Sequence, residues 1–174
     1  ADFEIADGHY RFKKILRSPH YSIATGLLSA PLDQSGVDVR EGDFLLSIDG
    51  QPVEINRNVS AYFENKVNQP IQIRVSSTAG GQQARTYTVV PTAGTGNLHN
   101  YDRAEANRRR VEELSGGRLA YIYVSSFGGA GFDEFTRALV GMSDKDGIVI
   151  DQRLNGGGTT ADSFIEALNR ETIY

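Results

Sequence analysis

The sequence contains no cysteine among its 174 residues. Disulfide bonds, thiol catalysis and cysteine-bound zinc are therefore excluded, although the cellular compartment stays open. No apolar run reaches membrane-spanning length and no signal-peptide pattern is present, so we expect no membrane partner. The formal net charge of −4 gives no electrostatic support for a nucleic-acid partner, and we expect none.

The sequence also lacks the patterns of metal and nucleotide sites. Asp144 and Asp146 flank Lys145, an arrangement more typical of a turn than of an oxygen cage for a cation. The Gly-x-Gly-x-x-Gly and Gly-Lys-Ser patterns of nucleotide-binding loops are absent. We therefore expect no metal and no cofactor.

The residues that are present suit an ordinary globular protein, with 39% hydrophobic and 23% charged residues. The length allows one large domain or two small ones with real cores. The chain begins without an initiator methionine, which favours a piece of a longer protein. We expect a cytoplasmic protein, with the periplasm as the alternative.

Residues 1–92 read as a β-rich domain. The turn pairs Asp7-Gly8 and Asp49-Gly50 and a glycine-rich hairpin loop at 79–82 separate short apolar runs. We expect strands at residues 3–5, 10–16, 43–48, 71–75 and 86–90. Apolar residues at helical spacing predict a helix over 59–67, capped by Asn58. Residues 18–32 have no period and are expected to form a long loop.

Residues 93–117 read as a small, polar linker followed by a charged helix over 101–114. Its run Arg108-Arg109-Arg110 is interpreted as a solvated face or an interdomain contact rather than a phosphate site. From residue 118 to 174, strand and helix alternate, which implies a parallel sheet. The expected elements are 119–124, 132–140, 148–150 and 160–168, the last capped by Thr159. Two parallel strands are too few for a stable domain, and we interpret this part as the start of a larger α/β domain.

A glycine loop follows the last predicted strand. Asn155 precedes Gly156, Gly157 and Gly158, and a helical pattern begins at once. Uncovered backbone N–H groups at a helix start can bind an anion or an oxyanion that develops in a reaction. A plain strand–loop–helix connection explains the same residues.

Parts of the sequence resemble two protein families. Residues 35–53, with Gly42-Asp43, an apolar strand and Asp49-Gly50, resemble the central part of bacterial PDZ domains. Residues 101–111, 117–124 and 151–158 resemble the S41 serine peptidases, and within them the tricorn-like peptidases. That family joins a PDZ domain to a catalytic α/β domain, so the expected fold class is α+β and α/β combined.

The resemblance implies a serine peptidase in which the glycine loop supplies an oxyanion donor, with Gly157 as the first choice. It also implies that the nucleophilic serine and the base histidine lie in segments outside this chain, so this chain alone is predicted to be inactive. The implied partners are peptide substrates and other domains of the same polypeptide. The full-length protein is expected to be a homo-oligomer.

The chain's own serines and histidines fit this interpretation. Ser125 and Ser126 follow a predicted strand end, but no histidine is placed by the sequence to activate them. Asp151 and Arg153 are expected to organise the loop rather than react. Two alternatives remain: a non-catalytic PDZ module that binds peptides, and an anion- or nucleotide-binding domain built on the glycine loop. The short turn at Asp7-Gly8, expected before the groove strand of a PDZ domain, argues against capture of C-terminal carboxylates, because Asp7 would repel an anion there.

Overall fold

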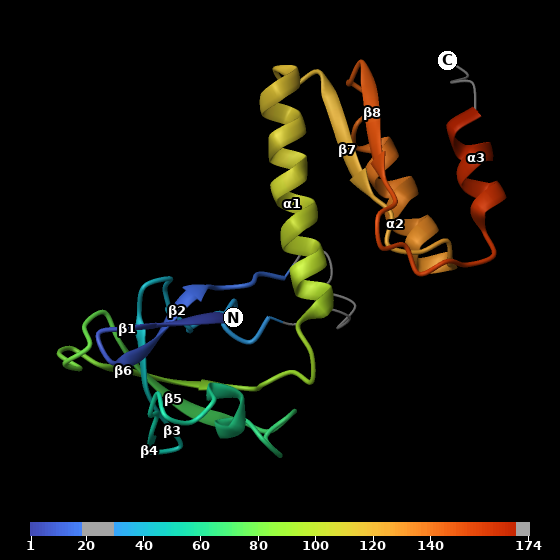
Figure 1. Ribbon diagram of the computed structural model, residues 1–174. Helices are drawn as coiled ribbons and strands as arrows, with labels where there is room; N and C mark the ends of the chain where they lie inside the picture. The colour runs from blue at the N-terminus through green and yellow to red at the C-terminus, as the bar shows by residue number, and fades with distance from the viewer. Residues whose placement is uncertain (19–29, 170–174) are drawn as a thin grey trace. The chain divides into compact units, whose positions relative to one another are not determined.

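The computed structural model describes residues 1–18 and 30–169 (Figure 1). Most of the predicted 18–32 loop, including His20, lies outside the described residues. The chain divides into two compact units, Ala1–Asp102 and Arg103–Tyr174, and each is described by itself. The architecture is mixed α+β, as the sequence predicts.

Unit 1 is built on an antiparallel sheet with the order β1-β2-β3-β5-β6, in which β4 also pairs with β3. Its strands are β1 (Asp2–Ala6), β2 (His9–Lys14), β3 (Phe44–Ile48), β4 (Gln51–Pro52), β5 (Ile71–Ser76) and β6 (Arg85–Val89). Strand β5 shows how the core forms, because Ile71, Ile73 and Val75 are buried while Gln72 and Arg74 are exposed. This two-residue alternation places one face of the sheet in the core.

The predicted turns of unit 1 are present. Asp7 and Gly8 have φ values of 47° and 74°, and Asp49 and Gly50 have 49° and 79°. Two successive residues with positive φ form the tight hairpin turn whose twist matches that of the flanking strands. These turns fix the register of β1 on β2 and of β3 on β4.

The predicted helix over 59–67 is wrong in length and type. Only Val59–Tyr62 is helical, as the 3-10 helix η1. Asn58 does cap it, because its side-chain oxygen accepts a hydrogen bond from Ser60 N at 2.9 Å. Asn65 has a φ of 59°, which is outside the right-handed helical region and prevents the helix from continuing.

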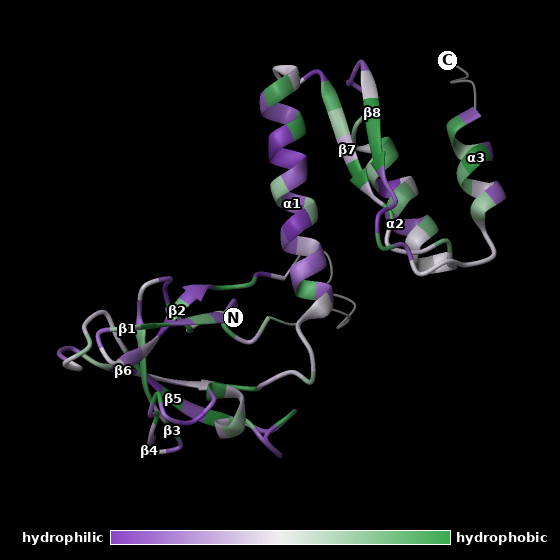
Figure 2. Cartoon of the chain, in the orientation of Figure 1, coloured by the Kyte–Doolittle hydropathy of each residue, from purple (hydrophilic) through white to green (hydrophobic). Residues whose placement is uncertain are grey.

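Helix α1 (Gly96–Ser115) begins inside the segment predicted as a small, polar linker. It is hydrophilic over most of its length (Figure 2). Arg108 pairs with Glu105 and Glu112, and Arg110 pairs with Glu113. Arg109 and Arg110 are exposed, which agrees with the interpretation as a solvated face.

Unit 2 continues with β7 (Leu119–Tyr123), α2 (Gly129–Val140), β8 (Gly147–Asp151) and α3 (Ala161–Asn169). Strands β7 and β8 are parallel, as the alternating pattern predicts. Helix α3 begins one residue later than expected, so Thr160 and not Thr159 precedes it. The core of this unit consists of Ile122, Val124, Phe135 and Phe164.

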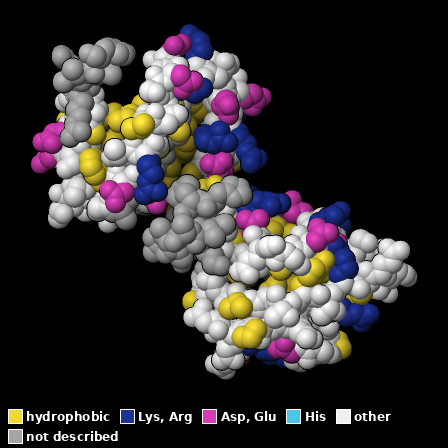
Figure 3. Space-filling view, turned by 180° about the vertical axis from the view of Figure 1, so that it is seen from behind, with side chains coloured by type: hydrophobic (Ala, Val, Ile, Leu, Met, Phe, Trp, Pro, Cys, Tyr) yellow, Lys and Arg dark blue, Asp and Glu magenta, His cyan; other side chains and the backbone are white. Residues whose placement is uncertain are grey.

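Several large apolar side chains of unit 2 are exposed, and Figure 3 shows apolar side chains at its surface. They include Val140, Val149, Leu154, Ile165 and Leu168. Among the described strands, β8 pairs with β7 alone. The idea that this unit opens a larger α/β domain stays a prediction. No helix formed by the described residues combines the length and apolarity needed to cross a membrane.

Candidate active site: the glycine loop after β8

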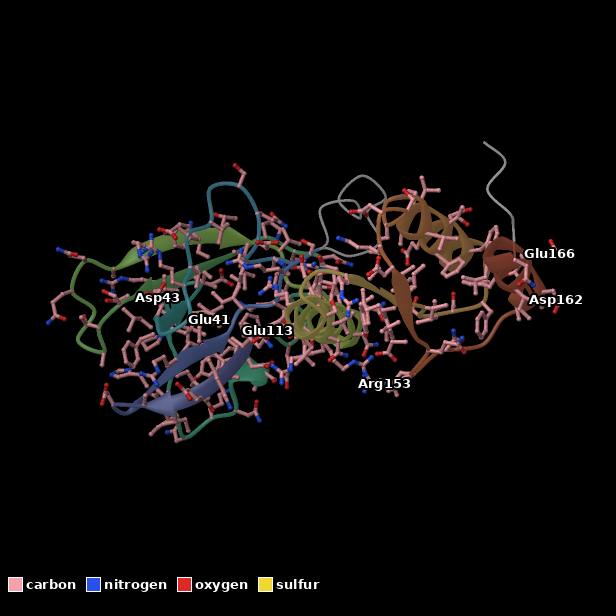
Figure 4. The ribbon with its side chains drawn as sticks, turned by 90° about the horizontal axis from the view of Figure 1, so that it is seen from above. Glu41, Asp43, Glu113, Arg153, Asp162 and Glu166 are labelled. Atoms are coloured by element: carbon pink, nitrogen blue, oxygen red, sulfur yellow. The ribbon has the colours of Figure 1, made fainter. Side chains whose placement is uncertain are left out.

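Asp151 ends β8 and organises the start of the loop. Its carboxylate is buried and accepts two hydrogen bonds from the Arg153 guanidinium, from Nε to Oδ1 at 2.9 Å and from Nη2 to Oδ2 at 2.5 Å. The backbone N–H of Arg153 donates to Oδ1 at 3.0 Å. Arg153 lies where the chain leaves β8 (Figure 4). The expected organising role of this pair is thus confirmed.

Tyr121 on β7 and Asn107 on α1 extend this network. The Tyr121 hydroxyl donates to Asp151 Oδ2 at 2.5 Å and accepts from Asn107 Nδ2 at 3.2 Å. Hydrogen bonds from Arg153 hold the pKa of the Asp151 carboxyl well below its ordinary value. Burial, assisted by the bond to Asp151, raises the pKa of the Tyr121 hydroxyl. Asp151 is therefore a fixed anion at neutral pH.

The side chain of Asn155 clamps the glycine loop. Its Nδ2 donates to the carbonyl of Val124 at 3.0 Å, and its Oδ1 accepts the N–H of Gly157 at 2.7 Å. The N–H of Gly156 donates to Ser125 O at 3.0 Å, and Phe127 N–H donates to Gly157 O at 2.8 Å. The loop is thus attached to the segment that follows β7 along most of its length.

The three glycines differ in what their N–H groups do. Those of Gly156 and Gly157 are already donated, to Ser125 and Asn155. The N–H of Gly158 has no acceptor within the part of the chain that the structure describes. All three residues are exposed. Gly158 is therefore the glycine whose donor is available without any rearrangement.

Backbone geometry explains why glycine occupies two of these positions. Gly157 has a φ of +84°, and a Cβ added there would meet nothing within 4 Å. Gly158 has a φ of +145°, and a Cβ there would lie 2.2 Å from the carbonyl carbon of Phe127. That carbonyl also accepts bonds from Thr160, from N at 2.9 Å and from Oγ1 at 2.6 Å. Close backbone contact thus holds the loop against Phe127.

Ser126, His9 and His99, which the structure describes, are found in roles other than a nucleophile–base pair. Ser126 Oγ accepts a long bond from Gly128 N at 3.4 Å. Both Ser125 and Ser126 belong to unit 2, whose sequence contains no histidine. In unit 1, His9 packs edge-on against Phe44, and His99 lies 3.4 Å from the Asp2 carboxylate.

Residues 1–18 and 30–169 contain no cluster of His, Asp and Glu able to hold a metal ion. Asp144 lies 3.5 Å from Lys145, and Asp146 lies 3.6 Å from Arg118, so both carboxylates face cations. The absence of a cofactor stays a prediction.

Unit 1 carries an apolar groove with a volume of about 410 Å³. Phe3, Phe12 and Phe63 line it, together with residues of η1 and of the segment that leads into α1. The described residues that line it include no Lys, Arg or His. Asp7 and Gly8, which we expected next to a peptide groove, are not part of its wall.

Sequence reasoning identified Asp151, Arg153 and the glycines but missed Tyr121 and Asn107. Their partners come from other elements, and no sequence spacing links α1 to β7 and β8. The clamp by Asn155 could have been anticipated, because an Asn side chain commonly bonds the backbone N–H two residues on.

The two units together define a class: a PDZ-type sheet followed by strand–helix alternation that ends in a clamped glycine loop. The tricorn protease PDZ domain family matches residues 1–93, and the chain belongs to this family. Tricorn protease homolog 1 of Streptomyces coelicolor is 30% identical over 167 residues, covering 96% of this chain and 15% of that protein. Tricorn protease of Thermoplasma acidophilum is 27% identical over 172 residues, covering 99% and 16%.

The fold agrees with these relatives. A crystal structure of the tricorn protease superposes with a TM-score of 0.79 at 27% identity, over 99% of this chain and 16% of that one. The chain thus spans about one-sixth of the length of the proteins it matches.

Proposed function

We propose that this chain is part of a tricorn-like serine peptidase of the S41 type that degrades peptides. Residues 1–92, which form most of unit 1, are its PDZ domain, residues 93–117 connect the domains, and residues 118–174 begin its catalytic domain. The nucleophilic serine and the base histidine come from segments that this chain does not contain. The membership of the chain in the tricorn family carries this proposal. Unit 2 holds two serines beside the loop but no histidine to activate them, which supports it.

The proposed role of the glycine loop is to donate a hydrogen bond to the oxyanion that forms when a serine attacks a peptide carbonyl. Such a donor must be rigid and must not be satisfied in the resting protein. The clamp by Asn155 and the contact with Phe127 provide rigidity. The Gly158 N–H has no acceptor among the described residues, so it meets the requirement of an unsatisfied donor. The Gly157 N–H would first have to break its hydrogen bond to Asn155. Helix α3 begins three residues after Gly158 and adds positive potential there.

Four further parts of the proposal concern the whole protein. Its other domains are expected to pack against unit 2, because apolar side chains such as Val149 and Ile165 are exposed there. Its substrates are peptides, and it forms a homo-oligomer in the cytoplasm. Size-exclusion chromatography of the full-length protein tests the assembly.

The loop is tested in the full-length protein with a fluorogenic peptide. Gly157→Val and Gly158→Ala should each lower kcat. Both variants keep the backbone N–H, but a side chain is strained at these positive φ values and, at position 158, overlaps Phe127, so the loop and its donor should shift. Misplacing one oxyanion donor should cost up to the roughly 100- to 1000-fold that its loss typically costs. Gly141→Ala is the matched control, since Gly141 ends α2 with a φ of −69° and an added Cβ would make only ordinary contacts. Circular dichroism separates loss of catalysis from loss of folding. Full activity in the Gly156, Gly157 and Gly158 variants would show that the loop is only a connection.

The 174-residue chain alone should give neither turnover nor labelling by a serine-directed phosphonate. Labelling at Ser125 or Ser126 would contradict the idea that the nucleophile lies elsewhere.

A second candidate function is peptide binding by unit 1 without catalysis. The apolar groove of about 410 Å³ favours it, because PDZ-type folds bind peptides in such grooves. Phe63 in the groove wall can be replaced by Ala in the full-length enzyme. An unchanged rate of peptide hydrolysis in this variant would separate groove binding from catalysis.

A further inference from the structure

Arg103 of α1 and Tyr123 of β7 are half-buried residues whose buried side-chain polar atoms are unsatisfied. The Arg103 guanidinium carbon lies 5.4 Å from the centre of the Tyr123 ring. Nε and Nη2 of Arg103 and the hydroxyl of Tyr123 are inaccessible to solvent, and none has a hydrogen-bond partner in the described part of the chain. Both residues belong to unit 2.

The neighbouring pair on the same two elements shows what is missing. Tyr121 and Tyr123 lie two residues apart on β7, on one face of the sheet, and Arg103 and Asn107 lie four apart on α1. Tyr121 and Asn107 bond to each other, and Tyr121 donates to the Asp151 carboxylate. Arg103 and Tyr123 likewise pair a residue of α1 with a tyrosine of β7, but no carboxylate accepts hydrogen bonds from them in the described part of the chain. Asp151, although paired with Tyr123 in register, is bonded to Tyr121 and Arg153.

The unsatisfied edge of Arg103 is the edge that binds carboxylates elsewhere in this protein. Nε and Nη2 of Arg153 bind the two oxygens of Asp151, and Nε and Nη2 of Arg40 bind those of Asp38 at 2.9 Å each. This side-on, bidentate geometry matches a carboxylate and is the strong mode of guanidinium recognition. Stacking on an aromatic ring offsets only part of the desolvation of a buried guanidinium. A buried arginine that cannot lose its proton therefore needs an acceptor on this edge.

We propose that Arg103 and Tyr123 form a carboxylate-binding site at the carboxyl end of β7. The carboxylate accepts two bonds from the guanidinium edge and one from the Tyr123 hydroxyl. Two sources present this chemistry: a free carboxylate of a peptide, and an Asp or Glu side chain from another segment of the full-length protein. The site lies close in sequence to Val124 and Ser125, whose carbonyls hold the glycine loop. It does not depend on the proposed peptidase activity.

Acetate is the probe, titrated into the 174-residue chain while the Nε–H resonance of Arg103 is followed by NMR. We expect a saturable shift at millimolar acetate that sodium chloride at equal ionic strength does not produce. Tyr123→Phe keeps the ring but removes one donor, and should weaken acetate binding about tenfold. Arg109→Lys on an exposed position of α1 is the control and should change nothing. The absence of a saturable shift, or equal binding by Tyr123→Phe, overturns the proposal.

The full-length protein distinguishes the two sources. If a peptide supplies the carboxylate, Arg103 should still respond to acetate and to a short peptide with a free C-terminus, but not to its amide. If an internal Asp or Glu supplies it, the Arg103 resonance should already be shifted and insensitive to acetate. A resonance that is unshifted and insensitive in the full-length protein overturns the site.

Discussion

The side-chain oxygen of Asn155 holds the backbone N–H of Gly157 at 2.7 Å, so the first-choice oxyanion donor is occupied by a residue of its own loop. The same side chain donates to Val124 O. Asn155 thus keeps the Gly157 N–H from bonding to a substrate oxyanion. Substitution of Asn155 is therefore a direct experimental test of the loop.

Asn155→Ala should release the Gly157 amide. One hydrogen bond is worth about 0.5–1.5 kcal/mol net, so amide exchange at Gly157 should accelerate by roughly 2- to 12-fold. The Gly156 amide, which donates to Ser125 O, is the internal control and should change less. Hydrogen exchange measured by NMR checks this. Unchanged protection at Gly157 would mean that the Asn155 bond does not persist in solution.

Substitution by Ala should affect Gly157 and Gly158 differently. At Gly157 only the positive φ is unfavourable, and Gly157→Ala should lower the free energy of unfolding by about 1–2 kcal/mol. At Gly158 a Cβ would overlap the backbone of Phe127, and the loss should be about 3 kcal/mol or more. Urea denaturation followed by circular dichroism measures both values. Equal losses would show that Phe127 moves away easily.

Asp151→Asn should destabilise the protein more at neutral pH than in acid. The folded-state pKa of Asp151 is depressed, so its contribution is complete above the unfolded pKa of about 4 and declines as pH falls through the folded value. Loss of its charge-assisted bonds should cost about 1–3 kcal/mol at pH 7. The difference between wild type and variant should shrink below about pH 4.

Denaturation curves at pH 7 and pH 3 measure this difference. Asp133→Asn on the exposed side of α2 is the matched control and should alter neither curve. A deficit in Asp151→Asn that is equally large at both pH values would argue that shape, not charge, explains the role of Asp151.

The groove of unit 1 should bind free C-terminal carboxylates poorly. Its wall includes Phe3, Phe12 and Phe63 but no Lys, Arg or His among the described residues, so a buried carboxylate would lack a cationic side chain. This reason replaces repulsion by Asp7, which is not in the wall. Fluorescence polarisation should show similar, weak binding of free-acid and amidated peptides. Micromolar binding that disappears on amidation would refute this expectation.

The sequence predicted the elements whose signals are local. Turn pairs such as Asp7-Gly8 and the apolar run before Asp151 located the strands and the glycine loop. The prediction from sequence was wrong where tertiary contacts determine the bounds of an element. Helix α1 starts at Gly96, among poor helix formers, because Leu98 is buried in a cluster with Leu16 and Ala30.

The predicted helix over 59–67 is wrong because the local pattern favoured a helix that the backbone does not form. Its apolar spacing reflects packing on the sheet, where Val59 and Phe63 contact the core, but Asn65 and Asn68 adopt positive φ values. Val67, the last apolar position of that pattern, is 41% exposed. The Tyr121–Asp151 bond and the Arg103–Tyr123 pair join separate elements, so no local pattern could have revealed them.

The contact between Gly158 and Phe127 also determines how much variation the glycine motif tolerates. Because a Cβ at position 158 would overlap backbone atoms, functional variants selected from a library should retain Gly at this position. Position 157 is open and left-handed, so Asn and Asp should recur there. The three glycines look equivalent in the sequence, but their information content is unequal, and position 158 should hold most of it.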